Sequence, residues 1–338
     1  MNRRTRRTLL VVAAVLIFLA VIIFLRSKAP PEAARLLPES QGIVYVDLKP
    51  LRAFFPGKLQ PAPHTPEYQQ FIDATGMDWE RDLDQAAIAL HRMPDPNGPN
   101  GAVGYSMVLV GKITGNRLNA WLDAHATSRE FYAGHTVYSI PSDGRTVRVA
   151  QIGYNMVAIS NMPTPEQIHS ILDRHATAAW PFAGSTLLRQ HYQDVPLLSL
   201  AWGVGQIGLP FSERGSIGIF GFSLPLEADA TLIASLTPAL SLKGMLNVKV
   251  VEIVAGDAQA SSQAAALRLL LSLARNFTAP LASNPANNGL KELLKTAVVK
   301  QERNRVVITA ALSRSLFSVL ADSKNPPAEI PSSPGAPQ

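Results

Sequence analysis

Three glycines, Gly203, Gly205 and Gly208, follow a strand-like run in the segment SLAWGVGQIGLPFSERG (199–215) and give the spacing G-x-G-x-x-G. In a dinucleotide-binding turn, this spacing opens a helix whose N-terminal N–H groups hold a pyrophosphate. Here Pro210 falls inside the stretch that should be helical, and four more glycines or prolines follow before residue 226. The sequence therefore predicts a loop or wide turn at this place, and no cofactor.

The histidines show neither H-x-x-x-H nor H-E-x-x-H spacing, although His125 and His175 occupy equivalent positions in an internal repeat. If the two repeat units packed about a pseudo-twofold axis, these rings and the nearby Asp123 and Asp173 would form a metal site. The alternative is that each ring lies in the last turn of its helix, where an imidazole can bond free carbonyl groups. We favour the alternative and predict no metal-binding residue. The full set of histidines is His64, His91, His125, His135, His169, His175 and His191.

No nucleophile motif can be written for the chain. Gly221-Phe222-Ser223 is not followed by x-Gly, and S-x-x-K does not occur. A serine–histidine–aspartate triad or a pair of catalytic acids is a geometry that one sequence does not reveal. We therefore predict no catalytic residue and keep open a hydrolase whose residues are dispersed along the chain.

Two further stretches have residue types that suggest a ligand. The segment DWERDLD (78–84) begins like a calcium loop, but Leu83 and Ala89 stand where the loop needs Gly and Glu, which favours a solvated acidic face. The segment AALRLLLSLA (265–274) is apolar almost all round. It is suited to a lipid-binding groove, but a buried core helix is the commoner structure for such a segment.

The elements that would position these residues include two copies of one pattern. Residues 104–127 and 153–177 both begin Gly-Tyr-x-Met-Val and both end Leu-Asp-x-His-Ala-Thr. Each copy predicts a strand, a turn and a helix capped by a threonine, Thr114 in the first copy and Thr164 in the second. Turn signals at 133–134 and 142–144 predict that the strands between the copies pair as a meander.

The remaining pattern predicts an α+β fold of mainly antiparallel sheets with packed helices. Two lobes are expected, 41–182 and 183–323. The second should contain a strand at 195–202, a long hairpin over 229–254, a helix over 257–277 and a last helix that begins at Ser313.

The N-terminal part has the pattern of a membrane anchor. Residues Leu9–Leu25 carry no charge, Pro or Gly and would span about 25 Å as a helix. Four arginines in the basic stub 1–8 predict that the N-terminus lies in the cytoplasm and that the rest of the chain is exported. A cleaved signal peptide is the alternative. Residues 26–40 read as a tether, and the Pro-rich tail 324–338 as disordered.

The net charge of +6 comes entirely from residues 1–28, because residues 29–338 carry 25 basic and 25 acidic side chains. The exported part is therefore neutral, which argues against nucleic acid as a partner. The chain has no cysteine, which excludes thiol catalysis and cysteine-ligated metal sites. A large exported region without cysteine fits a bacterial envelope.

The order LLPESQGIVYVDL, VLVGKI, FYAGHTVYSIP and VAQIGYNMVAIS resembles a diffuse group of bacterial single-anchor envelope proteins. Their exported α+β region is classed as a domain of unknown function. The resemblance implies a location in the inner membrane with a periplasmic domain, and it supplies no catalytic residues. We expect a non-enzymatic envelope binding, scaffolding or assembly factor with a protein or lipid partner. The alternatives are a periplasmic hydrolase and a lipid-handling module.

Overall fold

The structure is a computed structural model, and it describes most of the chain beyond the predicted anchor. The described residues are 29–54, 64–98, 100–142, 144–177, 183–206, 216–219, 222–225, 230–239, 245–278 and 285–313. The predicted span 9–25, the stub 1–8 and the tail 324–338 lie outside these residues. The helix predicted from Ser313 also lies outside them except for its first residue, and Ser313 belongs instead to the strand Arg305–Ser313. Among the helices that are described, none is long and apolar enough to cross a bilayer.

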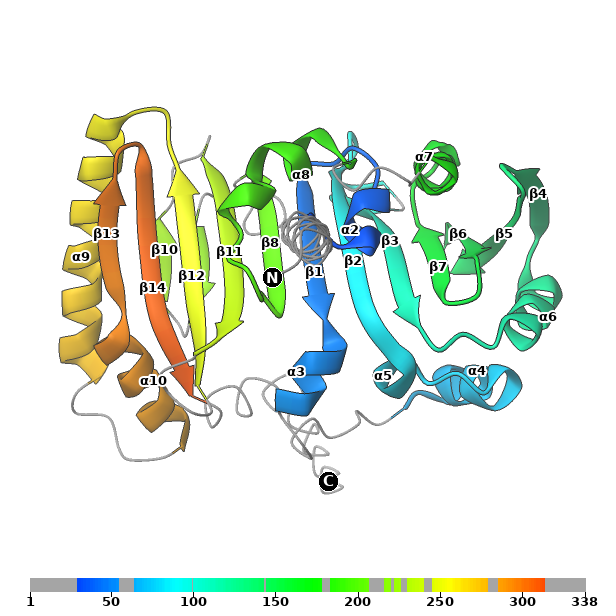
Figure 1. Cartoon of the computed structure of the whole chain (residues 1–338), viewed down its shortest axis with the longest axis horizontal. Coiled ribbons are helices and arrows are strands. Elements are labelled where there is room, and N and C mark those ends of the chain that lie inside the picture. Colours follow the sequence, from blue (N-terminus) through cyan, green and yellow to red (C-terminus); the bar gives the residue numbers. More distant parts are fainter. Residues whose placement is uncertain are drawn as a thin grey trace, which may run out of the picture.

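Twelve strands form one antiparallel sheet in the order β13-β14-β12-β11-β8-β1-β2-β3-β7-β6-β5-β4 (Figure 1). β1 pairs with β8, so the segments 41–182 and 183–323 contribute to the same sheet. The strands are β1 (Gly42–Asp47), β2 (Leu83–Arg92), β3 (Val103–Gly111), β4 (Ser128–Tyr132), β5 (His135–Ser142), β6 (Arg145–Ile152), β7 (Met156–Ser160), β8 (Ala201–Gln206), β11 (Thr231–Pro238), β12 (Met245–Ile253), β13 (Val298–Glu302) and β14 (Arg305–Ser313). β9 (Ser216–Ile219) and β10 (Phe222–Pro225) form a separate hairpin.

Helices cover both faces of this sheet. The first face, here called the α7 face, is covered by helices α2, α7 and α8, which share one core cluster with it. The opposite face, here called the α6 face, is covered by α4 and α6 at one end and by α9 and α10 at the other. The helices are α2 (Glu32–Leu36), α3 (Leu48–Phe54), α4 (Pro66–Thr75), α5 (Trp79–Asp82), α6 (Gly115–His125), α7 (Glu166–Ala176), α8 (Thr186–His191), α9 (Asp257–Thr278) and α10 (Pro285–Thr296).

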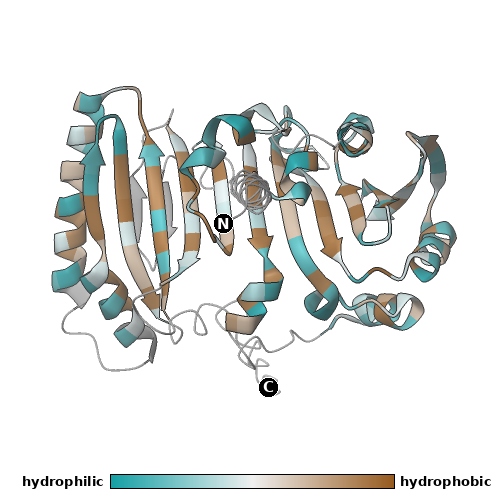
Figure 2. Cartoon of the chain, viewed as in Figure 1, coloured by the Kyte–Doolittle hydropathy of each residue, from teal (hydrophilic) through white to brown (hydrophobic). Residues whose placement is uncertain are grey.

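The core follows from the period of two along each strand. Alternate residues of β1 such as Ile43 and Tyr45 are buried on the α7 face, and Ile168 and Ile171 of α7 are fully buried against the same face. Figure 2 shows apolar residues along the central strands. α2 lies in this core as well. Part of the predicted tether therefore packs inside the protein, because its sequence AARLL buries almost completely.

These observations establish an α+β fold with a large antiparallel sheet. The predicted meander is confirmed: β4, β5, β6 and β7 pair in chain order. Ala133 and Gly134 both have positive φ, 47° and 83°, as a two-residue hairpin turn requires. β11 and β12 form the predicted long hairpin.

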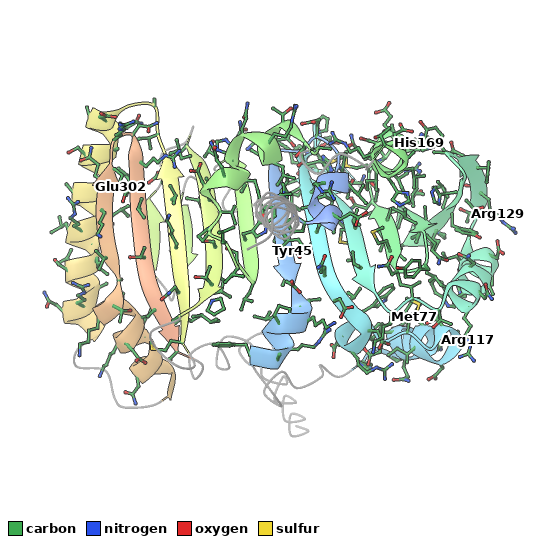
Figure 3. All side chains as sticks on the ribbon, in the orientation of Figure 1. Tyr45, Met77, Arg117, Arg129, His169 and Glu302 are labelled. Atoms are coloured by element: carbon green, nitrogen blue, oxygen red, sulfur yellow. The ribbon has the colours of Figure 1, made fainter. Side chains whose placement is uncertain are left out.

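The edge strand β4 is held by side-chain contacts with α7. The ring of Tyr132 stacks on His169 with 3.8 Å between centroids, and its hydroxyl donates to Asp173 Oδ2 at 3.1 Å. His169 Nε2 lies 2.9 Å from Glu130 Oε1. Figure 3 shows His169 on α7 near this edge of the sheet, with Arg129 on β4 beyond it. A charged edge strand tied down in this way resists pairing with other chains.

Two local predictions were wrong. The strand predicted at 195–202 begins only at Ala201, because Leu198 takes a positive φ of 64° in a turn before it. α7 begins at Glu166 with Pro165 as its N-cap, so Thr164 does not form the predicted capping box. Thr114 does precede α6 at the N-cap position, but its side chain makes no capping hydrogen bond.

Candidate functional site

The described structure contains a polar cleft between the start of α6 and the ends of strands β5 and β6. Its volume is about 350 Å³. Five of its side chains are amides or hydroxyls. Three glycines complete its wall, one at the start of α6 and two in turns between strands. The lining residues are Gly115, Asn116, Asn119, Gly134, His135, Thr136, Tyr138, Gln151 and Gly153.

The floor of the cleft depends on a close contact between Gly115 and Gln151. A Cβ atom on Gly115 would lie only 2.6 Å from Gln151 Nε2, so a residue with a side chain would push this amide aside. Gln151 Nε2 donates to the Gly153 carbonyl at 2.9 Å, which fixes the orientation of the amide. Its Oε1 atom is buried and has no hydrogen-bond partner. An acceptor whose bonding capacity is unfilled therefore lies just beneath the surface of the cleft.

Two exposed aromatic residues are direct neighbours of lining residues, one across the sheet and one along the chain. Phe131 on β4 is 76% exposed, and its cross-strand partner is Thr136 of the lining. Tyr154 is 84% exposed and directly follows Gly153. Among the large apolar residues that are strongly exposed in the described parts of the chain, these two are the aromatic ones. Both rings are therefore open to solvent close to the polar lining in the sheet or in the chain.

The electrostatics around the cleft are balanced. Apart from His135, which donates from Nδ1 to the Gln151 carbonyl at 3.0 Å, its lining contains no ionisable group other than the Tyr138 phenol. Burial raises the pKa of Tyr138, and the charge of Asp123 adds to the rise. Asp123 itself is neutralised by Arg129 at 2.8 Å. Apart from the imidazole of His135, the lining therefore presents hydrogen-bond donors and acceptors that carry no formal charge.

The predicted glycine motif is not a nucleotide site. Gly203 and Gly205 lie inside strand β8, paired with Val44 and Gly42 of β1, whereas a dinucleotide fold needs such glycines in the turn between a strand and a helix. The prediction of a loop was wrong for these two glycines, because the strand continues through them. Gly208 lies outside the described residues.

The two repeat histidines do not come together. Residues 104–127 and 153–177 each fold as a strand and a helix, but Val108 of β3 points to the α7 face and its equivalent Val157 of β7 points to the α6 face. α6 and α7 therefore cover opposite faces and separate His125 from His175. His125 instead bonds the Trp121 carbonyl from Nδ1 at 2.8 Å, as the helix-terminus alternative predicted. No group of three His, Asp or Glu side chains suited to a metal ion occurs among the residues described.

His175 has a different neighbour from the one its repeat position suggested. Its ring lies 5.7 Å from that of His135, and burial together with His135 lowers its pKa. His175 is therefore neutral at pH 7. The contact joins α7 to the end of β5 beside the polar cleft.

The other two ligand-like stretches have structural roles. In DWERDLD, Asp78 caps α5 by accepting from the Glu80 N–H at 3.0 Å, and Asp82 pairs with Arg81 at 2.8 Å. In 265–274, Leu267 is buried but Leu269 is 61% exposed. The prediction of a helix buried on all sides was wrong, because α9 lies at the edge of the molecule and covers the sheet with one side only (Figure 1).

A serine–histidine pair that the sequence did not reveal lies on the α7 face. His91 Nε2 is 3.2 Å from Ser106 Oγ, which is 3.1 Å from Ser160 Oγ. Both serines are fully buried and His91 is 5% exposed. A nucleophile must reach its substrate, so this pair does not support the hydrolase alternative in the described conformation.

The residues of the polar cleft were missed by sequence reasoning. The turn at Ala133-Gly134 and the start of the helix after Thr114 were both predicted, and both end at the cleft. Nothing in the sequence shows that these two ends meet, because the contact between Gly115 and Gln151 depends on how α6 packs on the sheet.

No family model and no curated protein matches this chain. Among solved structures, three crystal forms of TP0453 are similar to it. Form I has a TM-score of 0.44 at 10% identity and covers 88% of this chain and 98% of the other. Form III has 0.48 at 10% identity, with 87% and 99% covered, and form IV has 0.45 at 9%, with 86% and 96% covered. Similarity at this level carries no argument about function.

Proposed function

We propose that this protein is a membrane-anchored component of a bacterial envelope whose exported domain binds a neutral, hydroxyl-rich ligand such as an oligosaccharide. The observation that carries the proposal is the polar cleft, together with the exposed Phe131 and Tyr154, which neighbour its lining residues Thr136 and Gly153. Amide and hydroxyl side chains both donate and accept hydrogen bonds, as sugar hydroxyls require. Exposed aromatic faces pack against the apolar C–H faces of a sugar ring.

The charge and fit of the cleft favour this class of ligand over others. An anionic ligand would need cationic side chains, and Arg129 near the cleft is already paired with Asp123. An acyl chain would need an apolar wall, whereas this wall is formed by Asn116, Asn119, Thr136 and Gln151. A cleft of about 350 Å³ is large enough for one or two sugar rings.

The ligand-binding proposal is tested by calorimetry on the full chain in lipid nanodiscs, because maltoside detergents carry sugars that would compete. The probes are the uncharged tetrasaccharides of glucose and N-acetylglucosamine, with an oligogalacturonate as the anionic comparison. We expect one uncharged probe to bind with 1:1 stoichiometry. Replacing Asn116 and Gln151 by Ala removes two hydrogen bonds of about 1 kcal/mol each, so affinity should fall at least about tenfold.

The matched control is Asn97→Ala, which changes an exposed asparagine in the β2–β3 loop and should bind like the wild type. Failure of every uncharged tetrasaccharide to bind would refute the proposal. Equal affinity in the Asn116/Gln151 double variant would show that the ligand binds elsewhere.

The location in the envelope is tested separately. An alkaline phosphatase fused after residue 40 folds only when exported, because it needs disulfide bonds. We expect an active fusion that stays in the membrane fraction at high pH. Replacing Arg3, Arg4, Arg6 and Arg7 by serine should lower the phosphatase activity, since these charges orient the predicted span. An active fusion released into the soluble fraction would instead indicate a cleaved signal peptide.

A further inference from the structure

A second group of side chains lies on the α7 face, where β2 and β7 end and β3 begins. Gly104 of β3 is the cross-strand partner of His91 on β2, and it has no side chain to fill the space above it. Two methionine sulfur atoms fill that space instead. A Cβ atom on Gly104 would be 2.5 Å from Met162 Sδ and 2.9 Å from Met93 Sδ.

The two methionines belong to different segments of the chain, and both sulfur atoms lie over Gly104. Met93 directly follows β2, and Met162 lies in the loop from β7 to α7. Both methionines are half-buried residues, whereas His91, the cross-strand partner of Gly104, is buried. Methionine side chains adapt their conformation at little cost, so the pair can adjust around a small ligand.

The hydrogen bonds of His91 leave one ring nitrogen free. Ser160 Oγ donates to the Tyr105 carbonyl and accepts the Met162 N–H, so the Ser106 hydroxyl donates to Ser160. Ser106 Oγ then accepts from His91 Nε2–H, which assigns the remaining lone pair to Nδ1. A histidine whose other nitrogen is held by a hydrogen bond is the usual arrangement at a metal.

The three groups are two thioethers and one imidazole, and neither a thioether nor the neutral imidazole that binds a metal carries a charge. Thioether sulfur selects soft ions such as copper(I), whereas calcium and magnesium need oxygen ligands. Cysteine, the common alternative ligand for copper(I), does not occur anywhere in the chain.

The surrounding charge favours a monovalent ion. Arg148 donates to the main-chain carbonyls of Met162 and Pro163 at 2.7 and 3.1 Å, and so fixes the loop that carries Met162. The positive charge of Arg148 repels an added cation. The repulsion energy is twice as large for a divalent ion as for a monovalent ion at the same distance.

We propose that His91, Met93 and Met162 form a binding site for a monovalent soft metal ion, with copper(I) as the ligand. The site lies on the opposite sheet face from the polar cleft and uses none of its residues. The two proposals are therefore independent.

The test is competition for copper(I) under anaerobic conditions, with the full chain in nanodiscs and bicinchoninate as the coloured competitor. We expect the wild type to withdraw one equivalent of copper(I). The double variant M93L/M162L, which conserves volume and therefore the fold, should withdraw none. The matched control is M107L, a half-buried methionine of β3 that faces the other side of the sheet. It should behave like the wild type.

A second measurement locates the ion without relying on affinity. The chain has seven methionines, and in a spectrum of ¹³C-labelled methyl groups silver(I) should shift only the signals of Met93 and Met162. Absence of copper uptake by the wild type would overturn the proposal. Uptake that persists in M93L/M162L, or silver shifts confined to other methionines, would do the same.

Discussion

The buried imidazole of His91 predicts how the stability of this protein depends on pH. His91 is 5% exposed, it has no acidic partner among its hydrogen bonds, and burial lowers its pKa from 6.5 to about 4. Above pH 6.5 the ring is neutral in both the folded and the unfolded chain, so it adds no pH dependence. Between pH 6.5 and about 4 only the unfolded chain binds the proton, so acidification favours unfolding.

The size of this effect follows from the shift. Each pH unit below 6.5 should lower the free energy of unfolding by roughly 1.4 kcal/mol, which reaches about 3 kcal/mol near pH 4. His175 and His191 also have lowered pKa values and contribute in the same direction. The contribution of His91 must therefore be isolated by a variant. His91→Gln suits this purpose, because its amide donates to Ser106 but does not titrate.

The assay is urea unfolding of both proteins at several pH values between 7.5 and 4.5, followed by tryptophan fluorescence, to which the buried Trp202 contributes. The quantity of interest is the difference in unfolding free energy between wild type and H91Q. We expect it to shift by about 1.4 kcal/mol per pH unit below 6.5, in favour of the variant. If this difference stays constant over the range, the folded protein binds the proton at His91 as readily as the unfolded chain does. That result would refute the reasoning.

Two further predictions concern backbone positions. Gly111→Ala should destabilise the fold by about 1–3 kcal/mol, because the new Cβ would overlap the main chain of Asp82. Gly115→Ala meets only the movable amide of Gln151, so thermal unfolding should barely change while saccharide affinity falls. Equal melting temperatures for the two variants would contradict this. Thr65→Ala should cost about 1 kcal/mol, because Thr65 Oγ1 caps α4 by accepting from the Tyr68 N–H at 3.3 Å. Thr114→Ala, which removes no capping bond, is its control in the same melting experiment.

The sequence predicted local structure well where the signal was local. The turn at Ala133-Gly134, the meander of β4 to β7 and the hairpin of β11 and β12 all form where the sequence indicated. The sequence was misleading where tertiary contacts determined the local structure. β8 runs through Gly203 and Gly205 because β1 and β11 pair with it on both sides, and pairing overrides the weak strand preference of glycine.

The same distinction applies to the sites. The repeat suggested that His125 and His175 meet. Val108 and Val157 face opposite sides of the sheet, however, and the helices α6 and α7 that follow their strands cover opposite faces. The residues that do meet, such as Gly115 with Gln151 and Met93 with Met162, have no shared pattern in the sequence.

The amino-acid sequence by itself determined the α+β class, the hairpin turns, the neutral charge of residues 29–338 and the absence of any thiol chemistry. These properties depend on composition and on neighbours a few residues apart. Only the tertiary structure decided which sheet face each helix covers, and therefore which polar and sulfur-containing side chains meet. That choice depends on the strand register, because a shift of one residue moves every side chain to the other face.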